Sequence, residues 1–526
     1  MLRWVHETAQ TLEKGHREGI IFCETGPLSS YQYIVVGAGS AGCVIARRLS
    51  DAGASVLLLE AGGPDTNPAI HTPEHAMMLF GSECDWGYQT IPQRNLGQRT
   101  IGLNRGKVLG GCSSINAMLY VRGNPADFDH WASLGNSGWS YKDVLPLFKK
   151  SEHFQNGQNQ YHGGDGLLDV RFNPRPSSVA KAFTLAATNY GFEGPDWDYN
   201  GGKQEGGAGL YQMNVTVDGK RCSCAVAFLR GHNEKRLTIE TGAFVSKLGL
   251  ENSRVTSVSY SKDNKSHTAR AEQDIILCAG SIDSPKLLML SGIGPEEHLG
   301  QHGIQVHHKL EGVGQNLQDH CGVSTIFHNL KPEKEPSFFA EAALFFDSSG
   351  QNGLPDLQYH FMGSAFNPNR KEGPMDPSQF MFPAVLTQPK SRGTVSLASA
   401  DPSIPPRIDP NYLSEKSDLD SLKASIKMAR EIVKAEPLSQ FTGSEVMPGE
   451  TDLEEYIRQT TSTIWHPVGT CKMGTDETSV VDPNLKVCGL EGLRVADASI
   501  MPTITRGNTH APCVMIGEKM AEILMR

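Results

Sequence analysis

Short apolar runs alternate with amphipathic segments along the chain, and this alternation is typical of a mixed α/β protein. Residues 31–36 form a β-prone apolar run, and a second apolar run at 55–60 ends on an acid. Between them, residues 43–53 repeat apolar positions at helical spacing and stop near a glycine. The beginning of the chain therefore predicts a strand, a turn, a helix and a second strand parallel to the first.

The turn between the first strand and the helix is rich in glycine. Gly37, Gly39 and Gly42 follow the GxGxxG spacing. In this spacing the first glycine allows a tight turn, the second lets the backbone approach a pyrophosphate, and the third lets the helix pack closely on the strand. Glu60 follows Gly42 by 18 residues, where an acid hydrogen-bonds the hydroxyls of an adenosine ribose. The unit predicts a dinucleotide site and does not by itself separate FAD from NAD.

Later segments continue the mixed pattern. Residues 394–400 alternate like a strand, and residues 418–435 have an amphipathic helical pattern. No apolar run approaches the roughly 18 residues of a membrane helix, and residues 1–27 lack a signal-peptide core. We therefore expect no membrane span and, by default, a cytoplasmic protein. An N-terminal amphipathic helix would carry Leu2, Val5, Leu12 and Ile20 near one face.

Composition narrows the class of protein further. The chain has 526 residues, enough for two large domains or three ordinary ones. Its 48 Lys and Arg against 58 Asp and Glu give a net charge of −10, which argues against a general nucleic-acid binder. The 11 Cys form no CxxC pair and no Cys/His ladder, so they predict neither a disulfide scaffold nor a metal site. We expect mostly buried, reduced thiols.

A second glycine-rich stretch covers residues 105–131, and on composition alone it is either an ordinary loop or a backbone wall against a flat ring. Together with GAGSAG at 37–42, it resembles the glucose–methanol–choline (GMC) family of FAD-dependent oxidoreductases, most of all the choline dehydrogenases and alcohol oxidases. The resemblance runs from about residue 30 to the C-terminus. Its further segments are GSIDSPK at 280–286 with SGIG at 291–294, WHPVGTCKMG at 465–474, and LRVADASIMP at 493–502 followed by GNTH at 507–510.

The resemblance implies an α/β fold in two parts. One is a Rossmann-type FAD-binding domain assembled from discontinuous segments, and the other is an α+β substrate domain built on an antiparallel sheet. Motifs for one cofactor lie near residues 40, 110, 245 and 500, so the FAD domain cannot be continuous. We expect it to comprise 30–165, 233–320 and 470–526, with 166–232 and 321–469 as the substrate domain and 1–29 as an N-terminal extension.

The resemblance also implies how FAD is held. Some family members bind the flavin covalently through a His just after the GGxSS run, and here Ile115 has no nucleophilic nitrogen, so we expect non-covalent FAD. Cys112 stands where Ser or Thr is frequent, and we expect little effect because the loop would use mostly its backbone. The expected FAD contacts are Gly37, Gly39, Ser40, Ala41, Gly42, Glu60, Ala61, Gly106, Val108, Gly111, Ser114, Asn116, Ala117, Met118, Val245, Asp497, Ala498, Asn508 and Thr509.

The same resemblance implies a catalytic pair. His466, which precedes Pro467, matches the active-site His beside flavin N5, and Asn508 matches the second catalytic position. A neutral imidazole accepts the proton of an alcohol while hydride leaves for the flavin. The Asn508 amide would donate a hydrogen bond to the developing alkoxide. His510 would share a face with Asn508 in an extended stretch, and we expect it to support or pack rather than react.

These residues predict FAD-dependent oxidation of a primary alcohol to an aldehyde in a monomer or homodimer, with O2 or a quinone-like acceptor. The alternative on this scaffold is a cyanohydrin lyase. Light-driven decarboxylases of this fold lack the His of this motif, so His466 argues against that activity. A catalytically silent FAD-binding protein would not need both His466 and Asn508. The substrate stays open between a quaternary amine and an aromatic alcohol. The residues considered for the first are Trp86, Glu335 and Glu341, and for the second Phe338, Phe339, Phe345 and Phe346, whose more ordinary role is core packing.

Overall fold

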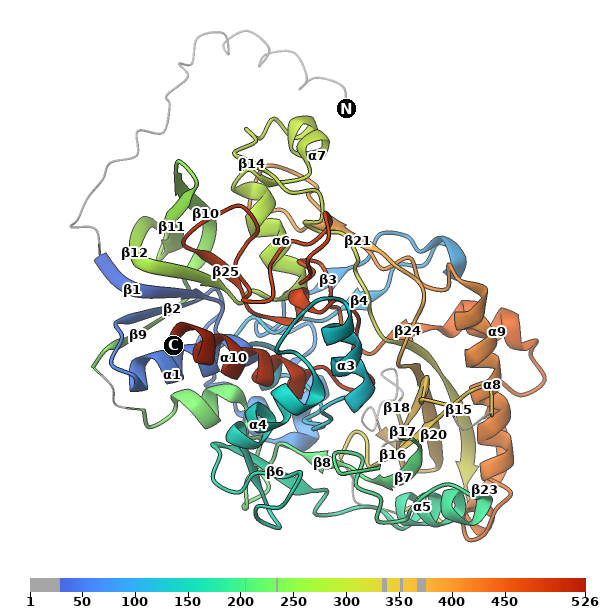
Figure 1. The fold of residues 1–526 in the computed structure, drawn as a ribbon. Coiled ribbons are helices and arrows are strands. Elements are labelled where there is room, and N and C mark those ends of the chain that lie inside the picture. The colour runs from blue at the N-terminus through green and yellow to red at the C-terminus, as the bar shows by residue number, and fades with distance from the viewer. Residues whose placement is uncertain (1–28, 204, 233–234, 334–337, 351–352, 367–374) are drawn as a thin grey trace, which may run out of the picture.

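The computed structural model describes residues 29–526 apart from 204, 233–234, 334–337, 351–352 and 367–374. The expected N-terminal helix and Glu335 lie outside these residues. Two seven-stranded sheets organise the described chain, one on each side of the molecule in Figure 1. This arrangement confirms the expected fold class, an α/β part joined to a part built on an antiparallel sheet.

The first sheet is parallel at its centre. Its strands in spatial order are β10 (Phe244–Glu251), β11 (Arg254–Lys262), β12 (Lys265–Leu277), β1 (Ser29–Val36), β2 (Val56–Glu60) and β9 (Leu237–Thr241), with β25 (Leu493–Val495) beside β12. Strand β1 pairs in parallel with both β2 and β12. These strands are apolar on both faces, and Ile34, Leu58 and Ile276 are fully buried, as in a sheet covered on both sides.

Three helices position the ligand-facing end of this sheet. They are α1 (Ser40–Asp51), α6 (Gly280–Leu290) and α10 (His510–Leu524). Helices α1 and α10 pack against each other, and α6 packs on β10 (Figure 1). Each begins directly after the end of a strand or a loop at the same edge of the sheet, so three helix N-termini gather there.

The second sheet is antiparallel and alternates in side-chain character. Its strands in spatial order are β23 (Thr442–Met447), β15 (Cys321–Asn329), β20 (Gln379–Leu386), β17 (Leu357–Phe361), β16 (Ala342–Phe346) and β7 (Gly207–Leu210), with β24 (Ser462–Thr463) beside β15. Phe380 and Phe382 point into an apolar core with helices α5 (Ser178–Tyr190) and α8 (Lys416–Ile432). The opposite face of the sheet carries Met381. This face is turned towards the β1–α1 turn and the start of α6 at the edge of the first sheet.

Smaller elements connect the two parts. A three-stranded sheet of β5 (Glu152–Phe154), β6 (Leu168–Phe172) and β8 (Gln212–Met213) crosses the predicted boundary at residue 165. The other helices are α2 (Pro68–His71), α3 (Pro125–Ser133), α4 (Tyr141–Ser151), α7 (Glu296–Gln301) and α9 (Leu453–Thr460). The short strand pairs are β3 (Tyr88–Gln89) with β4 (Gly102–Leu103), β13 (Ile293–Gly294) with β14 (His308–Lys309), β18 (Ala365–Phe366) with β19 (Met375–Asp376), and β21 (Thr394–Ser396) with β22 (Arg407–Asp409).

Two element boundaries differ from the expected ones. The strand predicted over 394–400 ends at Ser396, because the next amide, that of Leu397, donates to His298 Nε2 instead of the ladder. The helix predicted over 418–435 spans Lys416–Ile432. It stops before Pro437, which cannot continue a helix.

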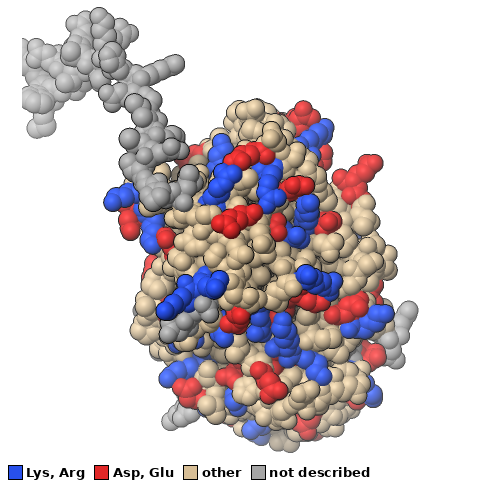
Figure 2. All heavy atoms as spheres, turned by 60° about the vertical axis from the view of Figure 1, so that its left-hand side comes forward, with Lys and Arg blue, Asp and Glu red and all other residues tan. Residues whose placement is uncertain are grey.

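Surface charge is mixed on the face shown in Figure 2. Acidic and basic side chains alternate there, and no continuous basic stripe is visible on that face. Within the described ranges, no helix is both long and apolar enough to cross a bilayer. The ten cysteines described are free thiols, and most are buried.

Candidate active site

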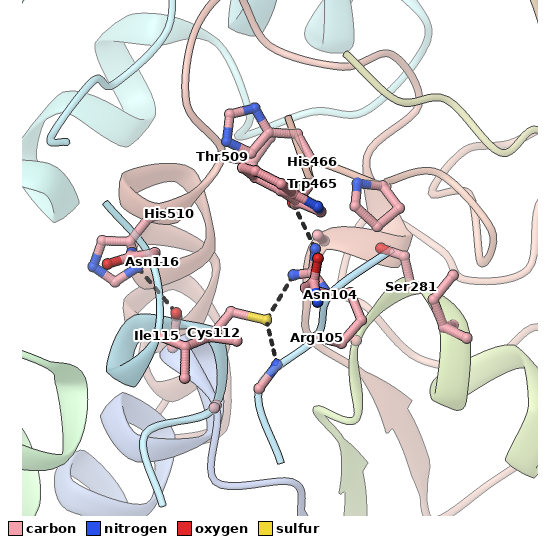
Figure 3. A pocket seen from close by; sticks show the side chains of 18 of the residues that line it. Asn104, Arg105, Cys112, Ile115, Asn116, Ser281, Trp465, His466, Thr509 and His510 are labelled. Carbon is pink, nitrogen blue, oxygen red and sulfur yellow. Dashed lines mark hydrogen bonds between the residues drawn. The ribbon is translucent and has the colours of Figure 1, made fainter. Parts of the chain in front are cut away.

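A cavity of about 500 Å³ is lined by residues of both sheets (Figure 3). One end is formed by the β1–α1 turn and the start of α6, and the other by the exposed face of the second sheet. Most of the segments singled out from the sequence therefore meet at one place. The predicted FAD contacts that line the cavity are Gly37, Gly39, Ser40, Ala41, Glu60, Ala61, Gly106, Gly111, Asn116, Ala117, Met118, Val245, Asp497, Ala498, Asn508 and Thr509.

The β1–α1 turn requires glycine for two different reasons. A Cβ at Gly37, whose φ is +102°, would lie 2.5 Å from the carbonyl oxygen of Cys278, and a Cβ at Gly42 would lie 1.9 Å from that of Gly37. A Cβ at Gly39 would meet only the Cys278 oxygen, at 3.8 Å, yet Gly39 lines the cavity. Gly39 also caps α1 without a side-chain hydrogen bond, so the first helical amides are available to an anion.

Glu60 stands at the end of β2 and faces the same cavity. Its carboxylate accepts the amide of Ala38 at 2.9 Å and the amide of Gly62 at 2.8 Å, which fixes its orientation. Burial raises the pKa of Glu60 to about 7. A carboxyl held this way has lone pairs left for the hydroxyls of a ribose.

Asp497 follows β25 and anchors the start of α6. Its Oδ2 accepts the amide of Gly280 at 2.8 Å and the hydroxyl of Ser284 at 2.6 Å. Close by, Ser281 Oγ and Asn508 Oδ1 are buried without a protein partner, although both residues line the cavity. Unpartnered buried polar atoms are expected where a ligand completes the hydrogen bonds, so the residues present fit a bound dinucleotide.

The backbone around His466 is held from three sides. The His466 amide donates to Asp319 Oδ1 at 2.8 Å, and the Trp465 amide donates to Thr463 Oγ1 at 2.7 Å. Arg105 Nη1 donates to the carbonyl of Trp465 at 2.5 Å (Figure 3). Trp465 has a φ of +65°, a strained conformation for a large residue, so these contacts over-determine where the next side chain points.

The protonation of the His466 ring is decided by a chain of hydrogen bonds. His320 Nε2 lies 3.1 Å from the carbonyl of Thr387, which only accepts, so His320 carries its hydrogen on Nε2. His320 Nδ1 must then accept from His466 Nδ1, 3.0 Å away. His466 Nε2 is therefore left with its lone pair, and the Asn508 amide donates to it at 3.3 Å.

The surroundings keep this imidazole neutral. Burial lowers the pKa of His466 well below its usual value of 6.5, and the neighbouring His320, His360 and Arg105 lower it further. Burial also lowers the pKa of His320 to about 4. A neutral His466 with an unprotonated Nε2 is the form that can accept a proton.

Comparison with known proteins agrees with this geometry. Two models described as GMC oxidoreductase match residues 31–322 and 389–517. The chain belongs to the GMC oxidoreductase family. This membership confirms the expected family and, with it, an FAD-dependent oxidoreductase.

Named members of the family cover nearly the whole chain. An oxygen-dependent choline dehydrogenase of Sinorhizobium medicae (strain WSM419) is 39% identical over 526 residues, which is 94% of this chain and 95% of the relative. An alcohol dehydrogenase (acceptor) of Pseudomonas putida is 40% identical over 534 residues, covering 94% and 96%. The crystal structure of pyridoxine 4-oxidase from Mesorbium loti superposes with a TM-score of 0.88 at 32% identity, covering 94% of this chain and 98% of that one.

Some expected contacts of this GMC oxidoreductase lie behind the cavity wall instead of on it. Gly42 packs α1 on β1, Val108 is buried in a small apolar cluster, and Ser114 donates its hydroxyl to the Leu109 carbonyl at 2.7 Å. Cys112 also differs from the expectation that this position uses mostly backbone. Its sulfur accepts Arg105 Nη2 at 2.7 Å, so the side chain helps to place the guanidinium that holds Trp465 (Figure 3).

His510 does not share a face with Asn508, because the chain is not extended there, and its expected supporting role is a separate prediction. Thr509 has helical dihedral angles and His510 is the first residue of α10, so the chain turns between them. His510 Nδ1 lies 3.0 Å from Ser40 Oγ, on the α1 side of the cavity. Burial lowers its pKa to about 4, and the ring joins α10 to α1 as a neutral group.

His320 is the functional residue that sequence reasoning missed. His320 directly precedes β15 of the second sheet, 146 residues before His466 in the sequence, and no local sequence pattern marks it. Only the combination of a buried His directly after Asp319 with a catalytic His elsewhere would have pointed to it. The two rings meet edge to face with centroids 5.2 Å apart.

Proposed function

We propose that this GMC oxidoreductase oxidises a primary alcohol to an aldehyde, with His466 as the general base. The observation that carries the proposal is the hydrogen-bond chain that leaves the lone pair on His466 Nε2, facing the cavity next to the Asn508 amide. The partners are a small-molecule alcohol and an electron acceptor, O2 or a quinone. A cytoplasmic location and a monomeric or homodimeric state stay predictions from the sequence.

The chain's own residues supply proton handling and orientation. FAD, when bound, supplies the hydride acceptor. His466 Nε2 takes the hydroxyl proton of the alcohol, a step typically worth 10²- to 10⁴-fold in rate. Asn508 has a second amide hydrogen that can donate to the alcohol oxygen as negative charge develops there. Because burial keeps His466 neutral, the base is available without prior loss of a proton.

We further propose that the cofactor is bound without a covalent bond. Ile115 is 3% exposed, lies in the wall of the cavity and carries only an alkyl side chain at the position where some members attach the flavin. The glycine turn, Glu60 and Asp497 offer hydrogen bonds along the dinucleotide instead. The affinity for FAD would then come from many non-covalent contacts spread over these segments.

Anaerobic mixing of the purified flavoprotein with a panel of primary alcohols tests the proposed function. An alcohol oxidoreductase bleaches the oxidised flavin band, because the electrons of the alcohol remain on the cofactor without an acceptor. A cyanohydrin lyase leaves the band unchanged. Readmission of air then shows whether O2 or another acceptor restores the oxidised flavin.

A further inference from the structure

The cavity has two kinds of wall. The dinucleotide motifs form one, and one face of the second sheet forms the other. Because side chains alternate along a strand, this face carries Met381 and Pro383 of β20, His360 of β17 and Ser324 of β15, with Met362 directly after β17. The residues between them point into the opposite core. None of these five wall residues carries a carboxylate.

Aromatic side chains close the rest of this end. Phe339 and Phe366 meet edge to face with centroids 5.9 Å apart, and Phe80 meets Trp465 in the same way at 4.8 Å. All four line the cavity. The described wall near the catalytic pair therefore presents mainly apolar and aromatic side chains beside His360 and Ser324.

The carboxylates that do line the cavity belong to the first sheet's motifs and are already engaged. Glu60 accepts two backbone amides, and Asp497 accepts Gly280 and Ser284. Asp283 accepts the hydroxyl of Tyr88 at 2.8 Å. Among the described lining residues these are the acids, and none comes from the second sheet.

His360 presents an unpartnered hydrogen-bond donor on this wall. Gln358 Nε2 donates to the Tyr211 hydroxyl at 2.8 Å, and that hydroxyl lies 2.8 Å from His360 Nδ1. The buried phenol can place its own hydrogen only on His360 Nδ1, so His360 carries its hydrogen on Nε2. His360 Nε2 is buried, lines the cavity and has no protein partner.

The electrostatic environment of this end opposes a cation. Arg105 lines the cavity beside Trp465, and the N–H of His360 turns the positive end of its dipole inward. The two candidate cage residues that the structure describes, Trp86 and Glu341, do not compensate. Trp86 stacks on Tyr88 and already has the ammonium of Lys107 at 4.7 Å from its ring centroid.

Glu341 serves a different purpose. It accepts the amides of Ser177 and Gly363 at 2.6 and 2.9 Å and does not line the cavity. Among the residues that the structure describes, a quaternary ammonium group at this end would lose its water without gaining a carboxylate.

We propose that this cavity selects uncharged alcohols with an apolar body and rejects alcohols that carry a quaternary ammonium group. The inference rests on the proposed function and narrows its substrate class. It separates this chain from the activity named for the choline dehydrogenase that is 39% identical to it. The neutral donor on His360 would meet an acceptor oxygen of the alcohol or its product.

Choline and 3,3-dimethylbutan-1-ol form a matched pair of probes, since they differ only by N⁺ against C at one atom. The holoenzyme is mixed anaerobically with each, and flavin reduction gives a limiting rate and a dissociation constant. We expect the ratio of rate to dissociation constant to be at least about tenfold higher for the neutral alcohol, because the cation is desolvated without a partner. An equal or higher ratio for choline overturns the inference and leaves alcohol oxidation intact.

A pair of variants isolates the effect of charge. Met381→Glu places a carboxylate on the wall, and Met381→Gln is its neutral match of the same length. We expect Met381→Glu to shift the preference towards choline by about tenfold or more and Met381→Gln to leave it unchanged. Equal shifts in both variants contradict the charge argument, and the wild-type pair decides the question if Met381→Glu lacks bound FAD.

Binding separates a failure of the inference from a failure of the proposed function. If no alcohol of any kind bleaches the flavin, the proposed function fails. The dissociation constants of the two probes are then read from the perturbation of the flavin absorbance alone. Tighter binding of 3,3-dimethylbutan-1-ol supports an apolar, uncharged site, and equal or tighter binding of choline overturns it.

Discussion

The basic nitrogen of His466 is chosen by its neighbours. The Thr387 carbonyl sets the tautomer of His320, which sets the tautomer of His466 and leaves the lone pair on Nε2. His320 is not among the residues that line the cavity and contacts His466, so we infer that it is a positioning residue that acts through His466. Its effect is expected in the pH profile as well as in the rate.

Substitutions at His320 test this role. The wild-type rate of flavin reduction should be flat at neutral pH and fall only below the usual 6.5 of an imidazole, because burial lowers the pKa of His466 and the base works unprotonated. His320→Ala should move the inflection upward, because His320 is one of the groups that lower the pKa of His466, and slow reduction by roughly 10- to 100-fold as the tautomer is no longer fixed.

His320→Gln is the matched control. A glutamine can donate to Thr387 and accept from His466, so we expect it to recover most of the rate that Ala loses. The measurement is the pH dependence of anaerobic flavin reduction in the three proteins. Identical profiles for the Ala and Gln variants would contradict the hydrogen-bond chain.

At the scale of residues, the sequence predicted those site residues that stand in local motifs. His466 and Asn508 stand in motifs of adjacent residues, and the structure brings them to 3.3 Å. His360 reaches the site through the register of β16 and β17, and His320 through the pairing of the start of β15 with β24, so a sequence without these pairings gives neither residue a special place. The extended stretch assumed around His510 was wrong, because a helix with Thr509 as its N-cap begins at that residue, whereas the supporting role expected of His510 stays a prediction.

At the scale of elements, the β1–α1 turn combines two demands that glycine meets differently. Gly42 lets α1 approach the Gly37 carbonyl, which is a packing demand within the protein. Gly39 has ordinary backbone angles, with a φ of −80°, and has room for a Cβ in the protein itself. The missing side chain of Gly39 leaves space on the cavity side, where a pyrophosphate would approach.

Two alanine substitutions separate these demands. Gly42→Ala should destabilise the fold by about 1–3 kcal/mol, because its Cβ would lie 1.9 Å from the Gly37 oxygen. Gly39→Ala should leave the melting temperature of the apoprotein near that of the wild type and weaken FAD binding by roughly tenfold or more. Thermal unfolding without FAD and titration with FAD measure the two effects, and equal stability loss in both variants would argue against the distinction.

Element boundaries were predicted less well than element types. The strand beginning at Thr394 and the helix around residue 425 exist as expected, but each ends early for a reason outside its own pattern. The Leu397 amide finds a histidine nitrogen 99 residues earlier in the chain, and such a partner is invisible to periodicity. Hydrophobic spacing predicted that these two elements form, whereas a distant hydrogen bond ends the strand and the approach to Pro437 ends the helix.

At the scale of the molecule, each large sheet is assembled from separated stretches of chain. Strands of the first sheet come from residues 29–60, 237–277 and 493–495, and strands of the second from 207–210, 321–386 and 442–463. The spacing of cofactor motifs along the sequence predicted such an arrangement. The domain boundaries stay predictions, and the small sheet of β5, β6 and β8 crosses one of them.

A non-covalent cofactor in a cavity lined by both sheets should stabilise the whole molecule. Acid precipitation is expected to release the yellow flavin into the supernatant, because Ile115 offers no atom for a covalent bond. Restoring FAD at about 100 times its dissociation constant should stabilise the fold by about 2.7 kcal/mol, seen as a higher melting temperature. Flavin that stays with the precipitated protein would contradict non-covalent binding.

The central claim is that the neutral imidazole of His466 removes the alcohol proton beside a bound flavin. The most direct measurement is anaerobic flavin reduction by an accepted alcohol in the wild type and in His466→Ala, both loaded with FAD. Both proteins should bind FAD, and the variant should be reduced about 10²- to 10⁴-fold more slowly. Reduction of the variant at close to the wild-type rate would contradict it.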